Sequence, residues 1–435
     1  MRKNKKIDIY KKVEQINVYI WDKFVGALAL DPKIGFYVFS YDPKFAKSGI
    51  ELSPIHMPLR DDQVPYVFSD LPENTYKRLP ALLADALPDD FGNALIDRYM
   101  AEKGIPKAQI TSLDRLAYMG KRAMGALEFR PANGPRTQRP TAIELSDLVE
   151  QARKSIKGDV DNDDHASAAL RSIIEVGTSA GGARAKAVVA WNAKTGEIKS
   201  GQVGAPDGFE HWLIKFDGMG RDSELGVSQD YGRIEYAYSL MAKQAGIQMS
   251  ECRLFEENGR AHFMTKRFDR EKNNIKNHLQ SLCAINHLDY KKKSTHSYEQ
   301  LFITMRELKL DHKSEIEAFR RMVFNVMGRN CDDHTKNISF MLRQGCGWDL
   351  APAYDMVFAH NPAGEWTSQH LMSINGKYKD FKLEDFHTLA KRFNLGKVGH
   401  IIEEVRSAVH SWPQFAKDAG VAKKEMERIK KLQSF

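Results

Sequence analysis

The sequence predicts an α+β fold in which two strand-rich segments precede a mostly helical C-terminal segment. Runs of β-branched and aromatic residues lie between residues 16 and 42 and again between 186 and 268. Apolar residues recur at helical spacing from about residue 294 to the end. Because 435 residues exceed one ordinary core, we expect three parts, residues 1–140, 141–270 and 271–435.

Composition indicates a soluble globular protein, with 42% hydrophobic and 28% charged residues. The net charge of +8 favours acidic partners such as nucleotides or nucleic acid, although the basic runs at both ends are also typical of solvated helix faces. Four cysteines without paired spacing argue against a zinc site and favour a reducing cytoplasm. The chain has neither a signal-peptide core nor a continuous apolar span, so we expect a cytoplasmic protein without membrane contact.

The N-terminal part is predicted to be an α/β module that ends near Arg130. Strands are expected at 16–21 and 36–42, interrupted in between by Gly26, by residues 31–33 and by Gly35. A helical pattern runs from residue 76 to a stop at Gly104, with one apolar face formed by Leu79, Leu82, Leu83, Ala86 and Leu87. Residues 131–141, rich in proline and glycine, form the clearest linker.

The middle part is predicted to be a sheet that carries one helix. Two helices are expected at about 142–156 and 165–175, followed by strands at 186–192, 211–216, 251–255 and 261–268. The dipeptide Asn258-Gly259 suits the tight turn of a hairpin between the last two strands, since both positions need positive φ. A helix at 233–247 is expected between the second and third strands, with Gly246 as its stop.

The stretch RNCDDHTKNISF, residues 329–340, concentrates polar groups after a predicted helix. Asp332 and Asn337 stand five positions apart, the spacing with which kinase-type phosphotransferases place a proton-accepting aspartate and a metal-binding asparagine. Lys336 would add positive charge near the transferred phosphate. A second acid, Asp355, follows a short hairpin and, with Asn337, would form an all-oxygen Mg²⁺ site. The alternative is that these aspartates, with Asp333, merely cap turns and a helix.

Upstream residues fit the same chemistry. Gly181 and Gly182 would let backbone N–H groups approach an anion, with charge from Arg184 and Lys186, although a glycine pair is also an ordinary turn signal. Lys215 lies in an apolar strand and needs a partner, for which Glu235 on the next helix is the candidate. The alternative is that both side chains are simply exposed.

These elements occur in the order found in kinases, and residues 265–268 would then be the hinge segment that holds adenine. The chain resembles the HipA family of bacterial serine/threonine kinases, the toxin partners of HipB-type antitoxins. The resemblance rests on VYIWDKFVGAL, LLADALPDDFG, TSAGGARAK, WLIKF, TKRFDR, DDHTKN and APAYDM. It implies a two-lobed protein-kinase-like fold with an N-terminal α/β subdomain and an all-helical C-terminal lobe.

The resemblance also implies roles for single residues. Asp332 would be the catalytic base, Asn337 and Asp355 the Mg²⁺ ligands, and Lys215 the residue that holds the ATP phosphates. Autophosphorylation at Ser179 would eject the glycine loop by charge repulsion, but Thr178 is adjacent, and Gly181, Arg184 and Ala185 depart from the commoner family pattern. ATP would also contact the whole glycine loop, Gly181, Gly182, Ala183, Arg184, Ala185 and Lys186. The remaining ATP contacts would be Lys266, Arg267, Phe268, His334, Thr335, Lys336 and Tyr354, together with Asn337 and Asp355.

The leading hypothesis is therefore an ATP- and Mg²⁺-dependent serine/threonine kinase that arrests growth by modifying a translation component such as an aminoacyl-tRNA synthetase. Its expected partner is a HipB-like helix-turn-helix antitoxin, through which it would reach DNA indirectly. Three alternatives stay open: a small-molecule phosphotransferase, a nucleotide-binding co-repressor that acts with a DNA-binding partner, and a metal-dependent hydrolase built on Asp332, Asp333 and His334.

Overall fold

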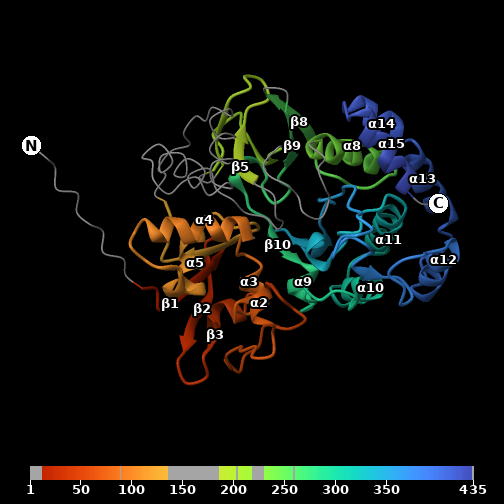
Figure 1. The fold of residues 1–435 in the computed structure, drawn as a ribbon. Helices are drawn as coiled ribbons and strands as arrows, with labels where there is room; N and C mark the ends of the chain where they lie inside the picture. Colours follow the sequence, from red (N-terminus) through yellow and green to blue (C-terminus); the bar gives the residue numbers. More distant parts are fainter. Residues whose placement is uncertain are drawn as a thin grey trace, which may run out of the picture.

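The computed structural model describes residues 12–88, 90–135, 186–201, 204–217, 230–257 and 260–433. They form an N-terminal part, a central sheet and a larger C-terminal part, which meet around strand β10 and helix α3 (Figure 1). The helices predicted at 142–156 and 165–175, the glycine loop before Lys186 and the turn at 258–259 lie outside the described residues.

The N-terminal part contains an antiparallel sheet of four strands in the order β3-β2-β1-β4. The second strand continues through Gly26, which was expected to interrupt it, although its pairing register with β1 shifts between Val18 and Tyr19. An added Cβ at Gly26 would lie 2.1 Å from the Ser40 carbonyl oxygen, so glycine lets the neighbouring strand approach closely. The strands are β1 (Gln15–Ile20), β2 (Lys23–Asp31), β3 (Phe36–Tyr41) and β4 (Leu127–Arg130).

The helical pattern expected from residue 76 to Gly104 forms three separate helices. Helix α2 ends at Lys77, which with Arg78 adopts positive φ, and Pro80 is the N-cap of α3. Pro88 lies between α3 and α4, where it cannot continue a helix. The predicted apolar face, Leu79 to Leu87, is nevertheless buried. The helices of this part are α1 (Pro43–Ala46), α2 (Glu73–Tyr76), α3 (Ala81–Ala84), α4 (Asp90–Ala101), the 3₁₀ turn η1 (Lys107–Gln109) and α5 (Ser112–Met119).

The central sheet has five antiparallel strands in the order β6-β5-β7-β9-β8. The four predicted strands are present, and Glu257 pairs with Arg260 as expected of a tight hairpin. Helix α8 (Tyr231–Gln244) packs against β8 and β9 and is followed by Gly246 at φ +80°. The strands are β5 (Lys186–Trp191), β6 (Ile198–Ser200), β7 (Glu210–Lys215), β8 (Cys252–Glu257) and β9 (Arg260–Lys266).

The C-terminal part is mostly helical, but the expectation that it is all helical is wrong. A three-stranded antiparallel sheet, in the order β10-β12-β13, lies at its boundary with the N-terminal part, and β11 pairs with β14 in parallel. The sequence indicated the β12–β13 hairpin but gave no sign of β10 (His278–Ser281), whose HLQS sequence has no β-branched residue. The other strands are β11 (His296–Ser297), β12 (Ser339–Leu342), β13 (Trp348–Leu350) and β14 (Met372–Ser373).

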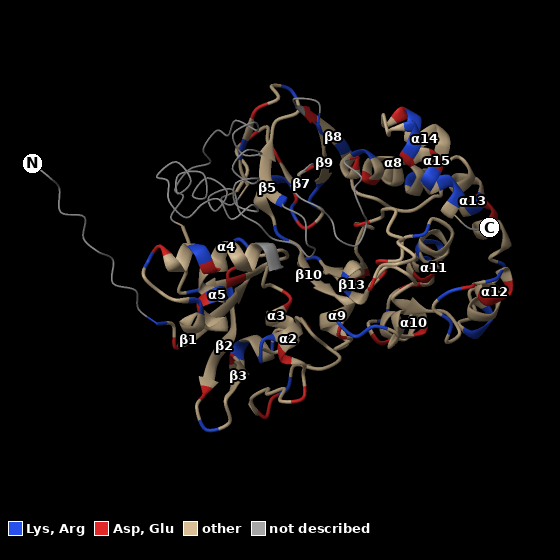
Figure 2. Cartoon of the chain, viewed as in Figure 1, with Lys and Arg blue, Asp and Glu red and all other residues tan. Residues whose placement is uncertain are grey.

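The helices of the C-terminal part enclose an apolar core that also takes in α8. Helix α15 buries Ile429 in this core, and Figure 2 shows that lysine and arginine occupy much of the rest of the helix, as expected of a solvated face. In the described part of the chain, no helix has the length and apolar character needed to span a membrane. The helices are α9 (Leu282–Ile285), α10 (Tyr298–Glu307), α11 (His312–Met327), α12 (Leu383–Arg392), α13 (Gly399–His410), α14 (Trp412–Asp418) and α15 (Lys423–Leu432), with 3₁₀ turns η2 (Lys272–Asn274) and η3 (Thr335–Asn337).

Candidate active site

A cleft opens where the three parts of the molecule meet. It encloses about 1010 Å³ of space between protein atoms, a value that includes its solvent-open region. Its lining includes nine residues singled out from the sequence: Lys186, Lys215, Lys266, Arg267, Phe268, Lys336, Asn337, Tyr354 and Asp355. Side chains from positions 186 to 355 of the chain therefore converge on one cavity.

Lys215 lies at the centre of an ion-pair network in this cleft. Its Nζ donates to Glu235 Oε1 at 2.5 Å, which is the contact expected between strand β7 and helix α8. It also donates to Asp355 Oδ1, 140 positions along the chain. The side chains of Lys215 and Glu235 are 13% and 3% exposed, so this network is largely shielded from water.

Electrostatics keep the network ionised. Burial lowers the pKa of Lys215, but the Asp355 and Glu235 carboxylates outweigh it and raise the pKa above its ordinary value. Burial raises the pKa of Asp355, but Lys215 and then Lys186 outweigh it and lower the pKa. Lys186 stands opposite Lys215 in the β5–β7 register and is itself buried. The Asp355 carboxylate is thus influenced by two lysines of the cleft, Lys215 and Lys186.

Of the loop after α11, Asn337 lines the cleft, whereas Asn330 and the predicted catalytic base Asp332 are not among its lining residues. Helix α11 begins with Asp311 as its N-cap and buries Phe319, Val323, Val326 and Met327, so its C-terminal end is fixed in the core. Asn330 Nδ2 donates to the Asp355 carbonyl at 3.2 Å, which ties the loop to the segment that carries the second acid.

Within this loop the asparagine side chain is oriented by a hydrogen bond. Asn337 Nδ2 donates to the Asp332 carbonyl at 2.8 Å, which leaves the amide oxygen for another donor or a cation. The Asp332 carboxylate is 46% exposed and lies 3.7 Å from His334 Nε2. Asp355 adopts φ +52°, a conformation that aspartate tolerates better than most residues and that marks sites held in place by their surroundings.

Asp333 has a different environment from Asp332, although the two are adjacent. Its fully buried carboxylate accepts hydrogen bonds from Tyr298 Oη at 2.8 Å, His370 Nδ1 at 2.9 Å and the Leu371 backbone N–H at 2.8 Å. Burial lowers the pKa of His370, but Asp333 outweighs it and raises the pKa to about 10. Asp333 is thus an internal anchor of the loop, which argues against a hydrolytic centre built on Asp332, Asp333 and His334.

Three further predicted contacts lie around the edge of this site. Thr335 is fully buried and donates to the Leu288 carbonyl at 2.6 Å, so its hydroxyl is turned into the protein. The His334 ring packs 5.2 Å from Tyr290 and is not among the cleft-lining residues. Tyr354 Oη donates to the Lys336 carbonyl at 2.7 Å, so Tyr354 contributes its ring to the cleft.

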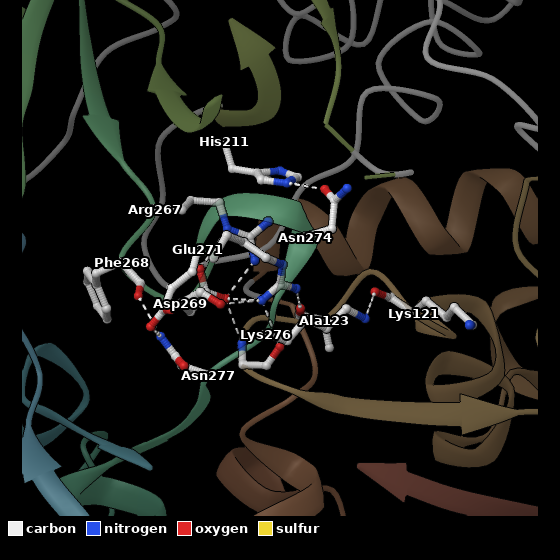
Figure 3. Close-up of polar contacts among 12 residues, drawn as sticks. Lys121, Ala123, His211, Arg267, Phe268, Asp269, Glu271, Asn274, Lys276 and Asn277 are labelled. Atoms are coloured by element: carbon white, nitrogen blue, oxygen red, sulfur yellow. Dashed lines mark hydrogen bonds and ion pairs between the residues drawn. The ribbon is translucent and has the colours of Figure 1, made fainter. Parts of the chain in front are cut away.

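The predicted hinge segment, residues 265–268, lines the cleft between β9 and β10. The Phe268 ring lies 5.9 Å from that of Tyr354. The Arg267 side chain is directed elsewhere, since its guanidinium donates to both carboxylate oxygens of Asp269 at 2.9 and 2.7 Å (Figure 3). Asp269 was not singled out from the sequence, where the only sign of its role was its position within TKRFDR.

The glycine-loop predictions cannot be placed in this geometry. Gly181, Gly182, Ala183, Arg184 and Ala185, with Ser179 and Thr178, lie outside the described residues, which resume at Lys186.

Comparison with known proteins agrees with the motifs. Residues 178–412 match the HipA-like C-terminal domain, more than half of the chain, and residues 16–130 match the HipA N-terminal domain. The chain belongs to the HipA family. This HipA-family chain matches none of the curated proteins at a significant level.

One solved structure has a similar fold over nearly the whole chain. A chain of the Shewanella oneidensis MR-1 toxin–antitoxin complex of HipA, HipB and operator DNA aligns with a TM-score of 0.64 at 15% identity, covering 96% of this chain and 94% of that one. The Helicobacter pylori proinflammatory kinase CtkA aligns with a TM-score of 0.30 at 11% identity, covering 51% of this chain and 92% of that one. The first match supports the predicted arrangement of an N-terminal α/β part, a sheet and a mostly helical C-terminal part.

Proposed function

We propose that this HipA-family chain is an ATP- and Mg²⁺-dependent kinase that phosphorylates serine or threonine in a protein. The observation that carries the proposal is the contact of Lys215 with both Glu235 and Asp355 inside the cleft. A strand lysine held by a helix glutamate is how kinases orient ATP phosphates, and an acid beside it is where they bind Mg²⁺.

The residues present suit Mg²⁺. Asn337 and Asp355 both line the cleft, and both offer the hard oxygen ligands that this cation prefers. The hydrogen bond from Asn337 Nδ2 to the loop backbone leaves the amide oxygen, not the nitrogen, for the metal. Bound there, Mg²⁺ would neutralise phosphate charge.

The remaining groups would orient the reactants and move a proton. Lys215, Lys186 and Lys336 would bind phosphate oxygens, and the hydroxyl oxygen of the substrate would form a bond to the γ-phosphorus as the bond to the β-phosphate oxygen breaks. Asp332, the more exposed of the paired aspartates, would accept the hydroxyl proton.

The biological role that we propose follows the family. The chain would act as a toxin whose partner is a HipB-type antitoxin, as in the HipA, HipB and operator DNA complex of Shewanella oneidensis, and it would reach DNA through that partner. A translation component such as an aminoacyl-tRNA synthetase is the proposed substrate class. Autophosphorylation at Ser179 or Thr178 would add about −1.5 to −2 charges beside the ATP phosphates and inhibit the enzyme.

Intact-protein mass spectrometry after incubation with MgATP tests the proposal. We expect a mass gain of one phosphate on the chain or transfer to a protein in a lysate, and neither with Asp332→Asn. Transfer to metabolites but not to protein would favour a small-molecule phosphotransferase instead. If neither protein nor metabolite becomes phosphorylated by the wild-type chain, the kinase proposal is wrong.

A further inference from the structure

Two segments of the C-terminal part are hydrogen-bonded to each other at the edge of the cleft. One is residues 334–336, which follow Asp332 and Asp333, and the other is residues 288–290, which belong to the connection between α9 and β11. The fully buried Thr335 joins them, because its hydroxyl donates to the Leu288 carbonyl at 2.6 Å. This bond fixes the distance between the two segments.

The ring of Tyr290 contacts the residues on both sides of Thr335. The centroid of the His334 ring lies 5.2 Å from that of Tyr290. Lys336 Nζ lies over the Tyr290 ring, 5.4 Å from its centroid. An ammonium group at this distance is attracted by the negative face of an aromatic ring. One ring therefore packs against two polar side chains that stand two positions apart.

Neither of these side chains has a hydrogen bond at the atom that would otherwise orient it. In the described part of the chain, His334 Nδ1 is buried without a hydrogen-bond partner, and no hydrogen bond or ion pair holds Lys336 Nζ. The orientation of both side chains therefore depends on their packing against Tyr290.

The backbone next to Tyr290 is itself fixed, in part by the N-terminal part of the molecule. Asp289 is 6% exposed, and its Oδ1 accepts hydrogen bonds from the Thr75 hydroxyl at 2.5 Å and from the Lys291 backbone N–H at 3.0 Å. The Asp289 carbonyl accepts a hydrogen bond from His296 Nε2 at 2.7 Å. These bonds hold the residue that precedes Tyr290, so the ring has a defined position.

The contacts of the ring reach both ends of the proposed reaction. His334 Nε2 lies 3.7 Å from the carboxylate of Asp332, which would accept the hydroxyl proton, and Lys336 lines the cleft in which the phosphates would bind. Phosphate transfer requires the proton acceptor and the phosphate at a fixed separation, because a misplacement of about 1 Å slows a reaction by roughly 100-fold. A ring that packs against both neighbours would maintain that separation.

We propose that Tyr290 is a positioning residue for phosphate transfer, whose ring holds His334 beside Asp332 and Lys336 in the cleft. This inference rests on the proposed function, because it concerns the same reaction. It makes the rate of transfer, rather than the affinity for ATP, depend on a side chain that is not among the cleft-lining residues.

Replacing the ring separates positioning from nucleotide binding. For each variant, one assay measures the rate of phosphate transfer from saturating radiolabelled MgATP into the chain or into the lysate protein that the wild type modifies. Displacement of a fluorescent ATP analogue measures the Kd for ATP. With Tyr290→Leu we expect the transfer rate to fall roughly 10- to 100-fold, because Asp332 and Lys336 lose their common support. The Kd for ATP should rise less than about threefold, since Lys186 and Lys215 would still bind the phosphates.

Two further variants guard against effects on folding. Tyr290→Phe keeps the ring and should transfer phosphate within about threefold of the wild-type rate. Tyr99→Leu removes a tyrosine of α4 with a comparable contact, Lys103 Nζ at 4.5 Å from its ring, but Tyr99 does not line the cleft, so neither quantity should change.

Three results would each overturn the inference alone. They are an unchanged transfer rate in Tyr290→Leu, a Kd for ATP that rises in Tyr290→Leu as much as the rate falls, and a Tyr290→Phe variant as slow as Tyr290→Leu. Absence of phosphate transfer by the wild-type chain would overturn the kinase proposal with it.

Discussion

Replacing Asp333 with asparagine tests whether Asp333 has a structural role inside the protein that the adjacent Asp332 does not have. Asp333 accepts three hydrogen bonds inside the protein, from Tyr298, His370 and Leu371, whereas its neighbour Asp332 is 46% exposed. An asparagine has one acceptor oxygen and an NH₂ group, so it cannot accept at both positions where the carboxylate does.

The expected loss of stability in Asp333→Asn is large, although the substitution only replaces one carboxylate oxygen with an NH₂ group. The His370 imidazolium would lose its charged partner in a site from which water is excluded, and breaking a buried pair in this way costs about 3–5 kcal/mol. That is a sizeable part of the roughly 5–15 kcal/mol by which folded domains are stable. For the exposed Asp332→Asn we expect a change within about 0.5 kcal/mol.

Denaturant unfolding followed by far-UV circular dichroism measures the difference in stability between the two variants. The kinase assay then measures whether each variant still transfers phosphate. Asp333→Asn should unfold at clearly lower denaturant concentration, whereas Asp332→Asn should unfold like the wild type but transfer no phosphate. If Asp333→Asn matched the wild type in stability, the buried network inferred around it would be wrong.

Three other perturbations give separate expectations. The carboxylate partner of the buried His370 raises the pKa of this histidine to about 10. The ion pair should therefore stabilise the fold fully below the unfolded pKa of about 6.5, and the stabilisation should be lost as the pH rises toward 10. His370→Gln should remove this pH dependence from the free energy of unfolding measured across the range. Lys215→Ala should lower kcat by about 10²-fold or more in the phosphotransfer assay, and a retained rate would remove the lysine from the mechanism. Gly125 adopts φ +78°, and a Cβ added there would lie 2.9 Å from the Leu279 nitrogen, so Gly125→Ala should lower the free energy of unfolding by about 2–4 kcal/mol. Gly345 adopts φ +79° with open space around it, so Gly345→Ala should lower it by only about 1–2 kcal/mol. Equal losses in thermal unfolding would contradict the close approach at Gly125.

Local patterns predicted much of the architecture. The alternation and residue types of β5, β7, β8 and β9, and the apolar spacing of α8 and α11, are properties of short segments, so the sequence indicated them at nearly the observed positions. The contact between Lys215 and Glu235 followed from the same reasoning, because a lysine in an apolar strand needs a charge on the element packed against it.

The errors have equally local causes. Gly26 was expected to interrupt a strand, but glycine is required there because the β3 backbone lies too close for a Cβ atom. Strand β10 carries no sequence signal of its own, since it is a strand only because β12 pairs with it. The helical pattern expected from residue 76 to Gly104 is divided by positive φ at Lys77 and Arg78 and again before Pro88, although its apolar face is continuous.

By itself, the sequence indicated a set of candidate site residues and most of the segments that are strands or helices, because periodicity, turn chemistry and motif spacing act over a few residues. Only the tertiary structure decided that Asp333 is an internal anchor and Asp332 is not, that Asp355 reaches Lys215, and that the loop 120–126 is hydrogen-bonded to Asp269 and Arg270. These facts depend on packing between segments about 40 to 145 positions apart, and no local pattern encodes which of two adjacent carboxylates is turned inward.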